Sequence, residues 1–332
     1  MIIVTGGAGF IGSNIVKGLN DSGREDILVV DNLESGQKFL NLVDCQIADY
    51  ADKRSFIEGI RNGEFGNEVE AIFHLGACSD TMNYDGLYMM SNNYEYSKSL
   101  LHFCQQHAAS YIYASSASVY GAGPVFREMP EYESPLNVYA YSKYLFDHYV
   151  RRMYDQRTAQ IVGLRYFNVY GDREQHKGRM ASVAYHFTHQ YRESGHVNLF
   201  EGIDGYENGG QLRDFVSVED VVSLNLYLLE NPSCSGIFNV GTGHCQSFND
   251  VAVATVNRCR EEEGEASLSL AEMQSQGLLR YIDFPETLKG KYQSYTEADI
   301  SALREAGYDR PFLTVEQGVS RYVGRLLEKL DG

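Results

Sequence analysis

Short apolar runs alternate with segments of helical periodicity through the first half of the chain. The segments 12–20 and 93–107 repeat apolar residues at the spacing of an amphipathic helix. Between such segments lie five runs typical of buried strands: Ile2–Thr5, Ile27–Asp31, Ala71–His74, residues 111–115 and Ile161–Tyr166. Apolar strands that alternate with helices predict a parallel sheet covered by helices on both faces.

The pattern becomes less regular from about Gly171 onward. The tract 201–211, rich in glycine and polar residues, predicts a long loop, and the mostly acidic segment 260–265 predicts a solvated helix face or turn. We therefore expect an α/β protein of two parts. Residues 1–170 form a Rossmann-type, doubly wound domain to which some later segments return, and residues 171–332 mainly form a smaller α/β lobe.

Composition narrows the classes of partner. The 332-residue chain has a formal net charge of −17, which argues against nucleic acid or an anionic membrane as a partner. The chain has no apolar stretch of about 18 residues, as a transmembrane helix needs. No basic segment precedes the first apolar run, so no signal peptide is predicted. Its six cysteines form no Cys-x-x-Cys pair, which predicts reduced thiols, no metal site and a cytoplasmic protein.

A glycine-rich turn follows the first apolar run directly. Gly6, Gly9 and Gly12 suit a tight turn, close approach of the backbone to a pyrophosphate and tight packing of the next helix on the strand. That helix would direct its free N–H groups and its positive dipole end at the phosphates. The position between strand and helix favours a dinucleotide site over an ordinary glycine turn.

The end of the second apolar run bears on which dinucleotide binds. Asp31 and Asn32 stand where an acidic residue usually binds the adenosine ribose of NAD. Asp31 alone would repel the additional phosphate of NADP, but Lys38 and Lys53 follow, and two cations can outweigh one carboxylate. If both lysines are ordinary surface residues, NAD is favoured, so composition leaves the choice open.

Three residues form a candidate catalytic group. Tyr139 and Lys143 lie at i and i+4, so they share a face of a helix, and Ser116 follows the fourth apolar run. A phenol of pKa about 10 is a poor base at neutral pH. An ammonium about 4 Å away, at an effective dielectric near 20, favours the phenolate by about 4 kcal/mol, which corresponds to roughly three pKa units. We therefore expect Tyr139 to act in acid–base catalysis, with Ser116 bonded to the reacting oxygen. Tyr141 lies off this face and is assigned to packing.

These motifs resemble those of the extended short-chain dehydrogenase/reductase superfamily, which includes nucleotide-sugar epimerases and dehydratases. Residues 213–216, Arg-Asp-Phe-Val, are similar to its nucleotide-diphosphate-binding element. Within the superfamily the chain resembles, from end to end, the epimerases of ADP-linked heptoses. Matching stretches include residues 165–171, and the most family-specific ones are residues 5–12, 176–178 and 180–184. It implies an isomerase that inverts carbon 6 of ADP-glycero-manno-heptose for lipopolysaccharide inner-core synthesis.

The resemblance also implies the ligands. It implies an ADP-sugar substrate, a homo-oligomer (a pentamer) and NADP, with Lys38 and Lys53 on the additional phosphate. Asn93 is placed as well as Asn92 to contact the cofactor. The expected cofactor contacts are Gly6, Gly9, Phe10, Ile11, Gly12, Asp31, Asn32, Lys38, Lys53, Leu75, Gly76, Ala77, Cys78, Ser79, Asn92, Lys143, Val169 and Lys177. The expected substrate contacts are Asn168, Arg179, His186, Phe200, Glu201, Gly202, Ile203, Arg213 and Tyr292.

The resemblance assigns a catalytic role to Lys177 as well. An epimerase removes hydride from one face of a carbon and returns it to the other, so the oxygen of the keto intermediate needs a proton donor in two orientations. Tyr139 and Lys177 would each serve one of them. The alternative for Lys177 is a loop cation that faces solvent or a phosphate.

Three other functions compete: a dehydratase, a 4-epimerase and a non-catalytic sensor. Dehydratases of the superfamily usually carry Asp-Glu directly after the active-site hydroxyl residue, whereas this chain has Ala117-Ser118, which argues against water elimination. A 4-epimerase stays open on chemical grounds. A non-catalytic dinucleotide sensor is disfavoured because Ser116, Tyr139 and Lys143 are all present.

Overall fold

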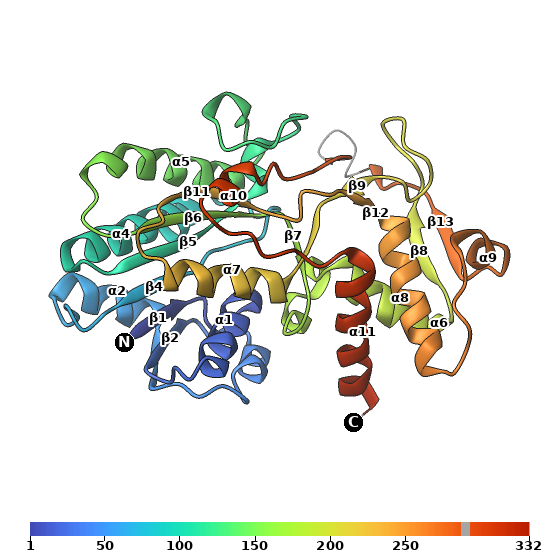
Figure 1. Ribbon diagram of the computed structural model, residues 1–332, viewed down its shortest axis with the longest axis horizontal. Helices are drawn as coiled ribbons and strands as arrows, with labels where there is room; N and C mark the ends of the chain where they lie inside the picture. The colour runs from blue at the N-terminus through green and yellow to red at the C-terminus, as the bar shows by residue number, and fades with distance from the viewer. Residues whose placement is uncertain (287–292, 332) are drawn as a thin grey trace. The chain divides into compact units, whose positions relative to one another are not determined.

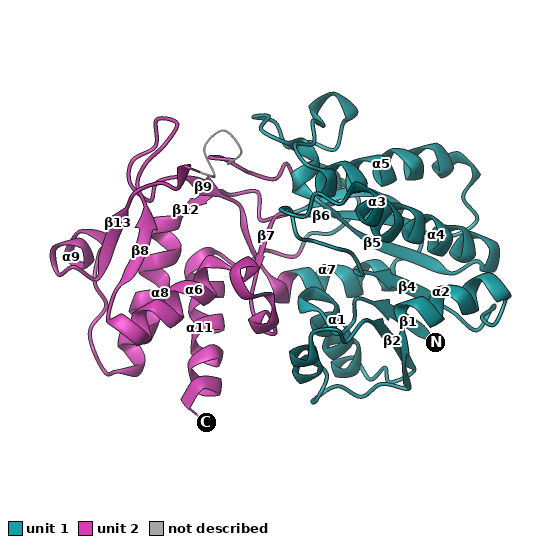
Figure 2. Cartoon of the chain, turned by 180° about the vertical axis from the view of Figure 1, so that it is seen from behind, with its two compact units in different colours: residues 1–166, 221–240, 301–309 teal, residues 167–220, 241–300, 310–332 magenta. Residues whose placement is uncertain are grey.

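The computed structural model describes residues 1–286 and 293–331, which form two compact units (Figure 1). Unit 1 contains residues 1–166, 221–240 and 301–309, and unit 2 contains residues 167–220, 241–300 and 310–332 (Figure 2). In the described part of the chain, no helix is both long and apolar enough to span a membrane.

The centre of unit 1 is a parallel sheet in the order β11-β6-β5-β4-β1-β2-β3. This order confirms the expected doubly wound α/β fold. Its strands are β1 (Ile2–Thr5), β2 (Ile27–Asp31), β3 (Asp49–Asp52), β4 (Ala71–His74), β5 (Ser110–Ser116), β6 (Ile161–Tyr166) and β11 (Gly236–Val240).

Two of these strands lie outside the five expected apolar runs. β3 lies at one edge of the sheet, and its sequence Asp-Tyr-Ala-Asp is polar and partly exposed, so it contains no apolar run. β11 is buried, but it comes from the second half of the chain and pairs with β6 from Gly236↔Val162 to Val240↔Tyr166. Its position is decided by long-range pairing, which local periodicity does not report.

Helices cover both faces of this sheet. Side chains of α2, α4 and α5 pack with Ile3, Val30 and Ile72 in one core. α1 and α7 pack so tightly together that a Cβ on Gly18 would collide with the Val222 side chain. The helices of this part are α1 (Phe10–Asp21), α2 (Lys53–Asn62), α3 (Gly86–Met89), α4 (Tyr96–His107), α5 (Val138–Met153), α7 (Val218–Glu230) and α10 (Ser301–Glu305).

The helix expected over residues 93–107 begins differently. Residues Met90–Glu95 form a π-helical turn, η2, and the α-helix α4 starts at Tyr96. Such turns inside helices are often found at functional sites. Both candidate asparagines, Asn92 and Asn93, lie in η2.

In its described residues, unit 2 contains three short two-stranded sheets and four α-helices around its own core. The tract 201–211 is a loop and residues 260–265 span the end of α8 and a turn, which confirms both expectations. The sheets are β7 (Asn168–Tyr170) with β10 (Phe215–Ser217), β9 (Leu212–Arg213) with β12 (Gln246–Ser247), and β8 (Val197–Phe200) with β13 (Leu279–Ile282). The helices are α6 (Val183–Ser194), α8 (Phe248–Glu262), α9 (Leu270–Ser275) and α11 (Val315–Asp331).

Candidate active site

The glycine turn between β1 and α1 excludes side chains at three of its glycines. Gly6 has φ 68°, and a Cβ there would lie 2.7 Å from the Gly76 nitrogen. A Cβ on Gly12 would collide with the Gly6 carbonyl oxygen. At Gly9, by contrast, a Cβ would meet the Gly6 oxygen at 3.1 Å. Protein packing therefore requires glycine at Gly6, Gly12 and also Gly7, whose Cβ would lie 2.8 Å from the Val4 carbonyl oxygen, whereas a Cβ at Gly9 would need only a small shift of its neighbour.

The N-terminus of α1 fits a pyrophosphate. Its N-cap is Gly9, no side chain caps the helix, and its first turn contains no acidic residue. The backbone N–H groups and the positive end of the helix dipole at Phe10, Ile11 and Gly12 are thus suited to an anion.

Asp31 is 5% exposed, and protein groups already bond both of its carboxylate oxygens. Oδ2 accepts a hydrogen bond from Ala8 N at 2.9 Å, and Oδ1 accepts one from Asn32 N at 2.7 Å and one from Lys38 Nζ at 3.0 Å. Asp31 therefore holds the glycine turn to the end of β2, and Lys38 balances its charge.

Lys53 provides a second cation at the same edge of the sheet. It follows Asp52, which pairs with Asp31 in the β2–β3 register. Its Nζ donates a hydrogen bond to Asn92 Oδ1 at 2.9 Å. Lys38 and Lys53 thus lie at the carboxyl ends of two adjacent strands, where α/β proteins bind their ligands.

The two candidate asparagines have different environments. Asn93 is 1% exposed, accepts a hydrogen bond from Cys78 N at 2.8 Å, and donates to Cys78 O at 3.0 Å and Ser142 Oγ at 3.1 Å. It therefore supports the loop that contains Leu75, Gly76, Ala77, Cys78 and Ser79. Asn92 is partly exposed beside Lys53.

Ser116, Tyr139 and Lys143 come together between the end of β5 and the first turns of α5. Ser116 Oγ accepts hydrogen bonds from Ser118 N at 3.2 Å and Ser118 Oγ at 2.9 Å. Ser116 also hydrogen-bonds the Tyr139 phenol. Since Ser118 donates both of these bonds, the single proton of Ser116 is left to donate to Tyr139 or to a reacting oxygen.

The pKa values in this group differ from expectation. Burial raises the pKa of Tyr139, and the hydrogen bond with Ser116 only partly opposes that effect. Lys143 is 5% exposed and donates to Ala114 O at 2.7 Å. Burial lowers the pKa of Lys143 to about 8, although the charge of Asp147 acts to raise it. The prediction that Lys143 lowers the pKa of Tyr139 is therefore wrong for this arrangement, because burial of the phenol dominates.

A buried ionic cluster supports this group, and it was missed from the sequence. Asp147, one turn after Lys143, accepts hydrogen bonds from Tyr113 Oη at 2.9 Å, Ser115 Oγ at 2.8 Å and Arg165 Nε at 2.9 Å. Glu133 pairs with Arg165 and also with Arg151. The available signal was Arg165 itself, a charge near the end of an otherwise apolar strand run.

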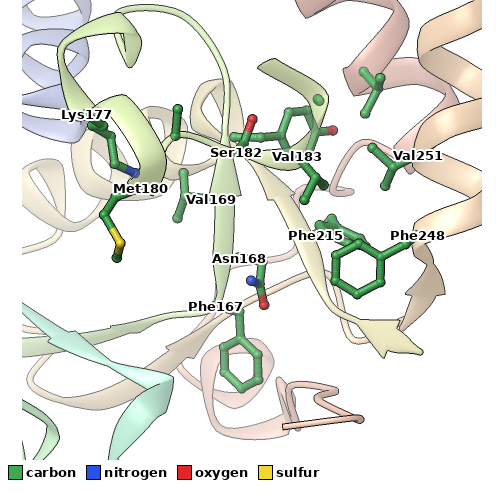
Figure 3. A pocket seen from close by; sticks show the side chains of 14 residues that line it. Phe167, Asn168, Val169, Lys177, Met180, Ser182, Val183, Phe215, Phe248 and Val251 are labelled. Carbon is green, nitrogen blue, oxygen red and sulfur yellow. The ribbon is translucent and has the colours of Figure 1, made fainter. Parts of the chain in front are cut away.

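In unit 2, Lys177 lies in the short 3-10 helix η6 (Gln175–Met180). Burial lowers the pKa of Lys177, and the charge of Glu174 opposes that effect. Figure 3 shows Lys177 and Asn168 at a pocket of about 260 Å³. The lining residues are mostly apolar: Phe167, Asn168, Val169, Tyr170, Lys177, Met180, Ala181, Ser182, Val183, Ala184, Phe215, Phe248, Val251 and Val319.

The other expected substrate contacts are spread over unit 2. Arg213 on β9 is 6% exposed, with its guanidinium 5.7 Å from the Phe248 ring centre. Arg179 is exposed on η6, His186 is partly buried on α6, and residues 200–203 lead from β8 into the long loop. Of the expected substrate contacts that the structure describes, Asn168 alone lines the pocket. Tyr292 lies outside the described residues.

Comparisons with known proteins agree with this geometry. Residues 2–241 match the NAD dependent epimerase/dehydratase family. The chain is 65% identical over 326 residues to the ADP-L-glycero-D-manno-heptose-6-epimerase of Thiobacillus denitrificans, covering 98% of each chain.

Solved structures give the same result. The Helicobacter pylori ADP-L-glycero-D-manno-heptose-6-epimerase is 30% identical with a TM-score of 0.79, covering 98% of this chain and 96% of that one. The Thermus thermophilus UDP-glucose 4-epimerase, in complex with NAD, is 27% identical with a TM-score of 0.74 and 97% coverage of both chains. The chain therefore belongs to the NAD-dependent epimerase/dehydratase family of nicotinamide-dinucleotide enzymes.

Proposed function

We propose that the protein is an isomerase that interconverts ADP-D-glycero-D-manno-heptose and ADP-L-glycero-D-manno-heptose at carbon 6 through a keto intermediate. The observation that carries this proposal is the 65% identity, over 98% of both chains, to a relative of that name. The proposal includes a cytoplasmic role in lipopolysaccharide inner-core synthesis and a homo-oligomer, a pentamer. Residues 1–170 would mainly bind the cofactor, and residues 171–332 would mainly bind the substrate.

NADP is the proposed cofactor. Asp31 already bonds Ala8, Asn32 and Lys38, so its carboxylate has little capacity left for ribose hydroxyls, which is the usual basis of NAD preference. Lys38 and Lys53 supply positive charge at the same sheet edge, and an additional phosphate would pair with both.

The chemistry in unit 1 follows from how its residues hold protons. When bound, NADP accepts a hydride from carbon 6 and returns it to the opposite face. Oxidation of carbon 6 also releases the proton of its hydroxyl group, so one proton carrier must accept a proton and the other must return one, and the two exchange roles in the reverse direction. Burial favours the protonated Tyr139 phenol, which donates to the ketone oxygen when the hydride returns; in the reverse direction Tyr139 accepts the hydroxyl proton as the phenolate. Ser116 donates a hydrogen bond to the same oxygen, and Lys143 stabilises the phenolate that forms.

Lys177 is proposed as the proton carrier for the second orientation of the intermediate. It lines the pocket of unit 2 beside Asn168, and burial lowers its pKa, so its ammonium releases a proton more readily than that of an exposed lysine. A phosphate ligand is the alternative role for this side chain.

The activity is tested by incubating the NADP-loaded protein with ADP-D-glycero-D-manno-heptose and following the 6-epimer by NMR. Lys177→Met should lower kcat by at least about 100-fold. A change in cofactor affinity alone would make Lys177 a phosphate ligand. Turnover of a UDP-hexose, without conversion of the ADP-heptose, would contradict the proposed substrate.

The cofactor is tested by calorimetric titration of NADP and NAD into Lys38→Met and Lys53→Met variants. Each loses a charge-assisted contact, so NADP affinity should fall by roughly 10-fold while NAD affinity changes little. Equal losses for both dinucleotides would contradict the assignment.

A further inference from the structure

The loop of residues 171–182, which carries Lys177, has an unusual backbone. Gly171, Arg173 and Gly178 all have positive φ, at 140°, 70° and 53°. Arg173 is not a glycine, so its conformation is strained and persists only where surrounding contacts impose it. Some group must therefore hold this loop in shape.

The carboxylate of Glu174 bonds both ends of the loop. Glu174 is 0% exposed. Its Oε2 accepts a hydrogen bond from Ser182 N at 2.6 Å, and its Oε1 accepts one from Ser182 Oγ at 2.6 Å and one from Gly171 N at 3.4 Å. The Glu174 carbonyl accepts Lys177 N at 2.9 Å, so the same residue also fixes the backbone of Lys177.

The loop is held in turn by the C-terminal helix. Tyr322 on α11 hydrogen-bonds Glu174. Asp172 accepts hydrogen bonds from Arg325 and, at 2.9 Å, from Lys329 of the same helix. The loop therefore rests on α11 through one buried and one partly exposed carboxylate.

A buried carboxylate is a costly way to close a loop, because a well-packed apolar side chain can stabilise a fold as well or better. A charge in this position has a further effect on neighbouring ionisable groups. Those that its charge affects are Lys177 in the loop, Tyr185 on α6 and Tyr322 on α11. Of these, Lys177 is the one that is cationic at neutral pH. The charge of Glu174 raises the pKa of Lys177, whereas burial lowers it.

We propose that Glu174 is the positioning residue of Lys177: its carboxylate closes loop 171–182 and its carbonyl fixes the Lys177 backbone, so that the Lys177 side chain lines the pocket. This inference rests on the proposed catalytic role of Lys177. Glu174 itself acts only through Lys177.

The test compares Glu174→Gln and Glu174→Asp in the NADP-loaded enzyme. Glu174→Gln removes the charge, so kcat should fall at least 10-fold with a small change in KM. The alkaline decline of activity should move to lower pH, because Lys177 then loses its proton earlier. Glu174→Asp keeps the charge but has a shorter reach, so kcat should fall while the alkaline decline stays in place.

Glu219→Gln is the matched control. Glu219 pairs with Arg321 and Arg325 on α11 but lies outside the loop, so its variant should keep wild-type kcat and pH profile. A second readout is the pH dependence of Lys177 acylation, followed by mass spectrometry. The midpoint of this acylation curve should move to lower pH in Glu174→Gln. The measurement does not depend on turnover of the substrate. If Glu174→Gln does not fold, Glu174→Asp alone carries the test.

The two hypotheses fail in different ways. A Lys177→Met variant with full activity contradicts the catalytic role of Lys177, whatever Glu174 does. The positioning role alone is overturned by a different pair of results. In that case Lys177→Met is inactive, while Glu174→Gln keeps wild-type kcat and the titration of Lys177 does not move. Wild-type kcat in Glu174→Asp overturns it as well.

Discussion

Tyr139 and Lys143 share a face of α5, but their side chains have different partners. Tyr139 hydrogen-bonds Ser116, whereas Lys143 donates to the backbone of β5 at Ala114. Burial moves both groups toward their neutral forms: it raises the pKa of the phenol and lowers that of the ammonium to about 8. A protonated phenol serves the reducing half-reaction, in which the ketone oxygen takes up a proton, and must lose its proton before it can serve the oxidising half-reaction.

Replacing Tyr139 with Phe removes this proton and leaves the packing of the ring in place. We expect kcat to fall at least about 100-fold, with NADP affinity unchanged, in a single-turnover assay. Tyr141→Phe is the control, because Tyr141 is 45% exposed and lies off the catalytic face. Near-normal activity of Tyr139→Phe would remove Tyr139 from the mechanism.

At the level of secondary-structure elements, Glu133 lies in the segment that precedes α5. Its ion pairs connect this segment to both α5 and β6. Its side chain is fully buried and pairs with Arg151 and Arg165. Burial opposes its ionisation, but the hydrogen bond from Arg151 and the charge of Arg165 outweigh burial and lower the pKa of Glu133 to about 2. A carboxylate with a lowered pKa stabilises the folded state above its unfolded pKa, and this contribution is lost as pH falls.

Glu133→Gln should therefore lower the free energy of unfolding by about 3 kcal/mol at neutral pH, since one pKa unit corresponds to about 1.4 kcal/mol. The difference from wild type should shrink as pH falls from about 4.5 toward 2. Urea denaturation across this pH range measures it. Glu131→Gln, an exposed neighbour, should show no such effect, and a pH-independent loss for Glu133→Gln would argue against the ion pairs.

The glycine turn offers a second test at the element level. Gly12→Ala should destabilise the fold, because its Cβ would collide with the Gly6 carbonyl. Gly9→Ala should cost no more than about 1 kcal/mol of stability, because the nearest protein atom would lie 3.1 Å from the added Cβ. It should nevertheless weaken cofactor binding strongly, because Gly9 caps the helix that would bind the pyrophosphate. Thermal unfolding and dinucleotide titration separate the two effects. Intact cofactor binding in Gly9→Ala would contradict the pyrophosphate site.

The molecule as a whole has two units with separate cores, and α11 belongs to the core of unit 2. Leu327 on α11 is 6% exposed and packs in the cluster that contains residues of α6 and α8. Leu327→Ala should cost about 3 kcal/mol. Hydrogen exchange should quicken in α6, α8 and α11 but not in β1, β4 or β5, because local stability follows local cores.

Leu330→Ala is the control for this prediction, because Leu330 is 42% exposed on the same helix and should change exchange little. Equal acceleration of exchange in the strands of unit 1 would show that the two units unfold together.

The sequence by itself determined the glycine turn, five of the sheet strands and the helical face shared by Tyr139 and Lys143. These follow from local spacing: alternation with helices predicts a parallel sheet, and an i, i+4 pair shares a face whatever surrounds it. The edge strand β3 and the strand β11 were not predicted, since one is polar and the other is placed by pairing with β6.

Tertiary structure alone decided the electrostatics. Contacts between distant residues and exclusion of water decide the pKa of Tyr139, the hydrogen bonds of Asp31 with Ala8 and Lys38, and the burial of Glu174 within the loop that carries Lys177. Spacing along the chain places a charge on a helix face, but how strongly that charge acts depends on what buries it.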